Sequence, residues 1–81
     1  MPYQNSEAIT MNRKESVTRI KKASKINGFT ILDVIPEFPG IKPTEIEAHL
    51  KKAYDLGFIS VNAKSPACMY PTNKLINFKI S

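Results

Sequence analysis

Residues 42–59 read KPTEIEAHLKKAYDLGFI, and this stretch decides the fold because it predicts a helix with a defined start and stop. Pro43 suits the first turn of a helix, where the missing N–H of proline costs nothing. The apolar residues recur at spacings of four and three and lie on one stripe: Ile46, Leu50 and Ala53. Gly57 supplies the left-handed conformation that commonly ends a helix. Residues 58–61 have strand character, so we expect a helix over 43–56 followed directly by a strand.

A first helix is predicted upstream, from about Arg13 or Ser16 to Asn27, with Gly28 as its stop. One side of this helix is apolar or small: Val17, Ile20, Ala23 and Ser24. The other sides carry the densest positive patch of the chain: Arg13, Lys14, Arg19, Lys21, Lys22 and Lys25. Two interpretations remain open. The patch is either a solvated face that suits the negative end of the helix, or a flank that contacts phosphates.

Residues 29–40 allow two local structures. In one, residues 29–31 form a short strand and Pro36 starts a brief helix. In the other, which we favour, Thr30 to Ile35 form a helical turn that is broken or kinked at Pro36, because proline clashes with the preceding turn. Thr30 followed by Asp33 resembles a capping box. Either structure supplies a short second helix, and residues 39–40 (Pro-Gly) then make a turn.

The best strand candidates after the central helix are residues 58–61 and 75–80, the latter because apolar and polar residues alternate there. The connection over 62–74 is long for a hairpin loop, and residues 67–70 are a candidate for an intermediate strand within it. Residues 1–12 are predicted to be a leader that is mobile or wraps a neighbouring subunit, with a short edge strand at 8–11 as a further alternative.

The succession TEIEAHLKKAYDLGFI, then a basic loop, then another strand resembles the winged helix-turn-helix superfamily. The resemblance extends over about residues 16–80 and is specific for the superfamily rather than for one family within it. It implies one α+β, mostly helical domain over residues 13–81. That domain has three helices and a C-terminal β-hairpin that forms the wing.

The resemblance implies that the helix over 43–56 docks in the major groove of double-stranded DNA. The residues expected to face the DNA on this helix are Lys42, Thr44, Glu45, Glu47, Ala48, Lys51 and Lys52. Lys64 and Lys74 flank the wing over 62–74, which would contact an adjacent groove or the backbone. The expected function is that of a small transcriptional regulator, and the usual need for two half-sites favours a homodimer. Small proteins of this type are common in bacteria and phages.

Two features of the expected reading face depart from strong DNA readers. It carries Glu45 and Glu47, and it has no Arg, the side chain that most often reads guanine. The main alternative is therefore a protein-binding winged helix, an adaptor or inhibitor that does not bind DNA. RNA binding is a weaker alternative, because no pair of aromatic residues lies beside the basic residues.

The composition limits the remaining classes of function. The chain has 81 residues, which allows one small core, and its net charge of +5 is compatible with a polyanionic partner. The single Cys68 and single His49 argue against a disulfide, a zinc cluster or a nucleophile pair, so we expect no enzyme activity, no metal and no cofactor. The absence of a long apolar run or a signal sequence predicts a cytoplasmic protein with no membrane span.

Overall fold

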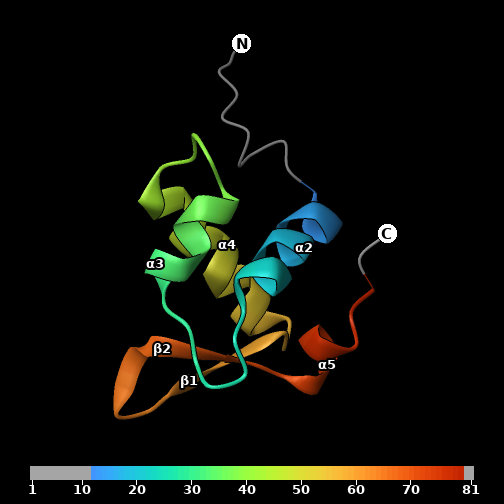
Figure 1. Ribbon diagram of the computed structural model, residues 1–81, viewed down its shortest axis with the longest axis vertical. Coiled ribbons are helices and arrows are strands. Elements are labelled where there is room, and N and C mark those ends of the chain that lie inside the picture. Colours follow the sequence, from blue (N-terminus) through green and yellow to red (C-terminus); the bar gives the residue numbers. More distant parts are fainter. Residues whose placement is uncertain (1–11, 80–81) are drawn as a thin grey trace.

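The structure, a computed structural model, describes residues 12–79. Its elements in chain order are α2 (Arg13–Ala23), α3 (Ile31–Val34), the 3-10 helix η1 (Ile35–Glu37), α4 (Pro43–Asp55), β1 (Ile59–Asn62), β2 (Ser65–Pro71) and α5 (Asn73–Ile76). The helices α2, α3 and α4 lie together, and the hairpin of β1 and β2 lies at one end of the group with α5 beside it (Figure 1). The described chain is a small α+β domain in which helix predominates, as predicted. The leader predicted over residues 1–12 lies, apart from Asn12, outside the described residues.

The central helix α4 confirms the prediction at both ends. Pro43 is its first residue, and Gly57 adopts a φ of +86° just after its end. The Gly57 N–H donates to the Tyr54 carbonyl at 3.0 Å, and the Phe58 N–H donates to the Ala53 carbonyl at 2.9 Å. These two bonds form a Schellman motif, which satisfies carbonyls that a helix end otherwise leaves open. The same turn directs the chain straight into β1.

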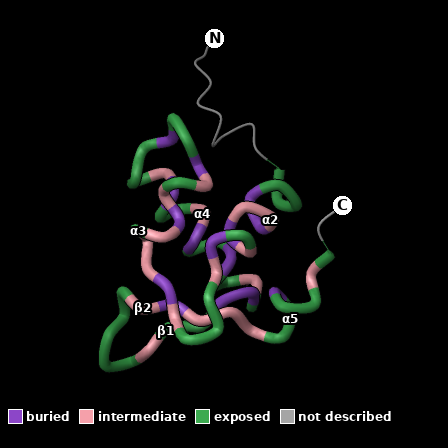
Figure 2. The backbone as a smooth tube through the Cα atoms, viewed as in Figure 1, coloured by how far each residue is buried: buried purple, intermediate pink, exposed green. Residues whose placement is uncertain are grey.

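One apolar core holds the elements together. Its buried side chains come from the helices, the hairpin and the loops between them: Val17, Ile20, Ala23, Phe29, Val34, Phe38, Ile41, Ile46, Leu50, Ala53, Phe58, Ile59, Met69 and Leu75. Figure 2 shows that the buried stretches lie where α2, α4 and the hairpin face one another. The three α4 residues predicted to form one stripe, Ile46, Leu50 and Ala53, are all in this core. The opposite side of α4 therefore remains at the surface.

Helix α2 begins where predicted but ends four residues earlier. The Asn12 side chain caps its start by accepting the Glu15 N–H at 2.8 Å. The helix ends at Ala23, and Gly28 is not its stop but part of the next turn, with a φ of +111°. The chain turns early because Phe29 must reach β2, where it exchanges backbone hydrogen bonds of 2.8 and 2.7 Å with Met69.

Residues 29–40 combine features of both predicted alternatives. Phe29 makes a single β-bridge to Met69, while α3 passes into η1 at Pro36, as the favoured kinked helix requires. The capping box is present, with the Thr30 side chain accepting the Leu32 N–H and the Asp33 carboxylate accepting the Thr30 N–H. The hydrogen bond from the Thr30 N–H lowers the pKa of the Asp33 carboxyl below its ordinary value, and the hydrogen bond from the Lys25 ammonium lowers it further.

The hairpin partner of β1 is β2, and the strand predicted over 75–80 is wrong. The register pairs Ile59 with Pro71 and Val61 with Met69, so the strand weighed over 67–70 lies within the true partner of β1. The following residues form α5 instead, because the Thr72 carbonyl accepts the N–H groups of Leu75 and Ile76. This additional helical turn, which the three-helix prediction does not contain, buries Leu75 completely.

Candidate nucleic-acid interface

The exposed side of α4 is the surface that sequence analysis predicted to meet a partner. With 3.6 residues per turn, the side opposite the buried stripe is centred on Thr44, Ala48 and Lys51, and all three are exposed. Glu47 and Lys52 are exposed along its two margins, Lys42 is exposed at the N-cap, and Glu45 is half-buried. The structure therefore brings the predicted α4 residues to one surface, with Glu45 set back from it.

The charge of this surface is balanced rather than strongly positive. Lys51 lies 3.8 Å from the Asp55 carboxylate, and both side chains are mostly exposed. An exposed pair of this kind contributes little to stability, so Lys51 can exchange this partner for another anion at small cost. Glu47 adds a further negative charge on the margin of the surface. Any affinity of α4 for DNA therefore depends on its flanking cations.

The hairpin contributes one of the two lysines predicted for it. Lys64 lies exposed in the turn between β1 and β2, where its N–H donates to the Asn62 side chain at 2.9 Å. Lys74 lies instead at the end of α4, where its Nζ donates to the Leu56 carbonyl at 2.6 Å and lies 4.6 Å from the centre of the Phe58 ring. The hairpin thus ends at Pro71, before the end of the predicted wing over 62–74, and Lys74 contacts the end of α4 instead.

Three of the six basic residues in the first helical region also have structural partners. Lys21 donates from Nζ to the Ile76 carbonyl at 2.9 Å and to the Phe78 carbonyl, which fastens the C-terminal segment to α2. Arg19 pairs with Glu15 at 2.9 Å and lies over the Phe38 ring at 5.6 Å. Lys25, just beyond the helix, pairs with Asp33 at 3.0 Å. These contacts favour the structural interpretation of this half of the patch.

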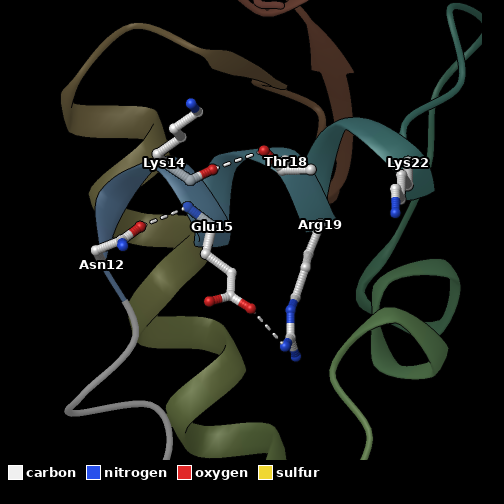
Figure 3. A pocket seen from close by; sticks show the side chains of 6 residues that line it. All are labelled: Asn12, Lys14, Glu15, Thr18, Arg19 and Lys22. Carbon is white, nitrogen blue, oxygen red and sulfur yellow. Dashed lines mark hydrogen bonds and ion pairs between the residues drawn. The ribbon is translucent and has the colours of Figure 1, made fainter. Parts of the chain in front are cut away.

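The outer face of α2 has a shallow hollow of about 400 Å³, lined by side chains of this helix and its cap: Asn12, Lys14, Glu15, Thr18, Arg19 and Lys22. Most of its polar groups bond one another, as the dashed lines of Figure 3 show for Asn12 with Glu15, for Thr18 with the Lys14 carbonyl and for Glu15 with Arg19. The ammonium groups of Lys14 and Lys22 make no ion pair within residues 12–79. The hollow is therefore an exposed cationic surface whose other polar groups mostly bond one another.

Sequence analysis missed a cleft between α2 and α4. It has a volume of about 250 Å³ and is lined by Arg13, Ser16, Val17, His49, Lys52, Ala53 and Leu56. Arg13 and Lys52 are 39 positions apart in the sequence, and no local pattern predicts that the fold brings them to one cleft. The periodicity of α4 does predict that His49 and Lys52 are neighbours, because they are three residues apart.

His49 is half-buried at this cleft. Its ring stacks on Phe38 with the ring centres 5.5 Å apart. Burial lowers the pKa of His49, and of the nearby charges Glu45 raises it while Arg19 lowers it further. The imidazole is therefore mainly neutral at pH 7. Its Nε2 atom is buried and has no hydrogen-bond partner among the described residues.

A second groove, of about 220 Å³, lies between α4 and β2. Its lining is mostly apolar, with one carboxylate: Ile31, Glu47, Leu50, Pro66, Ala67 and Met69. An apolar groove with an acidic margin is poorly suited to a nucleic-acid backbone, because it offers no positive charge. It is the feature of the structure that best fits the protein-binding alternative.

The described residues contain no group of three His, Cys, Asp or Glu side chains placed to hold a metal ion. Across the same part of the chain, no helix has the length and apolar content needed to cross a bilayer. Cys68, the second member of the pair weighed as a nucleophile, is half-buried on β2. Comparison with protein families, curated proteins and solved structures finds no match to this chain.

Proposed function

We propose that this protein is a small DNA-binding regulator with a winged helix-turn-helix architecture. In this proposal α4 enters the major groove, and the turn of the hairpin contacts the adjacent backbone. The order of elements supports it, since α2, the α3–η1 segment and α4 precede a β-hairpin. The bridge between Phe29 and Met69 ties the segment between α2 and α3 to that hairpin.

The observation that carries the proposal is the exposure of α4. The helix is held by a single buried stripe, and its opposite side is exposed from Thr44 to Lys51. Near the start of the helix, Lys42 and Thr44 would reach base edges, and Ala48 would contact a thymine methyl group. Lys52 and Lys64 would contact phosphates, joined by Lys51 once it leaves Asp55.

Salt dependence tests this proposal directly. The anisotropy of a fluorescent random-sequence duplex would be measured with the full chain between about 50 and 200 mM salt. We expect the affinity to fall steeply with salt, because each neutralised phosphate contributes about 0.9 to the slope of log K against log salt. The double substitution Lys51→Ala and Lys52→Ala should therefore flatten the slope by roughly 1.8. No binding at low salt, or an unchanged slope in the double variant, would refute the docking of α4.

The protein-binding alternative makes the opposite prediction for the acidic residues. If DNA is the partner, Glu47→Gln combined with Asp55→Asn removes two negative charges near phosphates. At ~8 Å in water each charge opposes binding by about 0.5 kcal/mol, so duplex affinity at low salt should rise roughly fivefold. If the groove beside Glu47 binds a protein, the same variant should bind that protein more weakly. A duplex affinity that does not rise would favour the alternative.

A further inference from the structure

We propose that the cleft between α2 and α4 is a binding site for a single phosphate group, held by Arg13 of α2 and Lys52 of α4. The site shares Lys52 with the proposed docking of α4 on DNA but does not require that docking, and its first test uses free phosphate. The two basic residues come from different helices and line the same cleft, which has a volume of about 250 Å³.

The charges around the cleft favour an anion. Arg13 and Lys52 are both cations, and no carboxylate is among the lining residues. Neither side chain takes part in an ion pair within residues 12–79. Two cations facing one small cleft repel each other, and an anion between them removes that repulsion. Arg and Lys are also the side chains that proteins most commonly use to bind phosphate.

The acceptors that would repel an anion are already occupied. The Lys52 carbonyl accepts the Leu56 N–H at 3.0 Å, and the Ala53 carbonyl accepts the Phe58 N–H at 2.9 Å. The Leu56 carbonyl, just beyond the end of α4, accepts from the Lys74 Nζ at 2.6 Å. The hydroxyl of Ser16 donates to the Arg13 carbonyl at 3.1 Å. The polar side chains that remain for a ligand are therefore the two cations.

His49 lines the same cleft and can report on what binds there. Its Nε2 is buried without a partner among the described residues, whereas buried polar atoms in folded proteins almost always have one. Because this atom is closed off from solvent, an anion in the cleft does not reach it, so the imidazole senses the site without holding the ligand. Glu45 on its own helix raises the pKa of His49 and Arg19 on α2 lowers it, while burial, the largest effect, also lowers it.

The size of the cleft limits the ligand. Pockets for drug-sized molecules are usually about 300–1,000 Å³, so this cleft suits one phosphate group with a short attachment. Its apolar floor, formed by Val17, Ala53 and Leu56, would contact the attached carbon atoms. The phosphate belongs either to a small molecule or to a nucleic-acid backbone, and the experiment separates these sources.

His49 is the only histidine of the chain, so its imidazole NMR signals report on the cleft without ambiguity. The 81-residue chain would be titrated at constant pH and ionic strength with sodium phosphate, using sodium chloride as the reference. We expect a saturable shift of the imidazole signals with phosphate. Arg13→Gln or Lys52→Gln should weaken the apparent affinity about tenfold, the effect of losing one charge-assisted hydrogen bond.

Lys14→Gln is the matched control, because it removes the same charge from the position next to Arg13 without touching the cleft. If Lys14→Gln and Arg13→Gln weakened phosphate binding equally, the effect would be one of general charge and the proposal would be overturned. It would also be overturned if neither phosphate nor a short duplex gave a saturable shift of the imidazole signals. A shift with free phosphate supports a small-molecule source. A shift with the duplex alone, lost in the Arg13→Gln variant and retained in Lys14→Gln, assigns the site to a nucleic-acid backbone. The phosphate titration contains no DNA, so the proposed phosphate site can be refuted while the proposed docking of α4 on DNA stands, and the reverse.

Discussion

Replacing Lys74 by methionine separates the structural lysines from those available to a partner. Lys74 donates to the Leu56 carbonyl at the end of α4, and its ammonium lies 4.6 Å from the centre of the Phe58 ring. A cation at a helix C-terminus contributes about 0.3–1 kcal/mol, and an exposed cation–π contact contributes about 0.5–1 kcal/mol. Methionine keeps most of the aliphatic stem, so the lost unfolding free energy reports the contribution of the ammonium group.

The two contributions add to about 1–2 kcal/mol, which lowers the Tm of a domain of this size by roughly 5–15 °C. The measurement is thermal unfolding followed by circular dichroism, together with urea unfolding to obtain the free energy at 25 °C. Lys64→Met is the matched control, because Lys64 is exposed in the hairpin turn and its side chain has no partner among the described residues. We expect its unfolding free energy to change by less than about 0.5 kcal/mol.

The duplex assay should give the reverse order. Lys64→Met should weaken binding and flatten the salt slope, while Lys74→Met should leave the slope unchanged, because the Lys74 ammonium is held at the end of α4. A Lys74→Met variant as stable as the parent would refute the structural role. Equal loss of stability in the Lys64→Met variant would refute the distinction between the two lysines.

Two further predictions concern the core and its titration. A Cβ on Gly28, which has a φ of +111°, would lie 2.9 Å from Cys68 Sγ, so Gly28→Ala should cost about 2–5 kcal/mol in urea unfolding, and Cys68→Ala should recover part of this. Gly57→Ala, with its nearest contact at 4.0 Å, should cost only about 1–2 kcal/mol; equal costs for the two glycines would contradict this. His49 has a lowered folded-state pKa, so the unfolded chain binds more protons as pH falls through about 6.5 and stability should decrease there. His49→Gln should remove this decrease, which urea unfolding between pH 7.5 and 5 measures. A variant whose unfolding free energy still fell by the same amount over this range would contradict the assignment to His49.

Part of the candidate surface was predictable because it follows from local geometry. The spacing of the α4 stripe predicts which residues are buried, and the remaining helix positions follow at 100° per residue. Thr44, Ala48 and Lys51 are exposed for this reason. The cleft was not predictable, because Arg13 and Lys52 come together only through the packing of α2 on α4.

The sequence by itself determined the elements whose signals lie within a few residues. It specified α4, the Schellman turn at Gly57, the capping box at Thr30 and the interruption at Pro36, because caps, glycines and prolines act on their immediate neighbours. It also specified a net positive charge, which is a sum that needs no structure.

Only the tertiary structure decided which strand pairs with β1 and which cations are engaged. The alternation over residues 75–80 was compatible with a strand, but β2 occupies the partner position and Leu75 reaches the core from a helical turn. Lys21 bonds the carbonyl of a residue 57 positions away, and Lys74 bonds one 18 positions away. Strand pairing and ammonium–carbonyl contacts join segments that are distant in the chain, so their partners exist only once the core has brought those segments together.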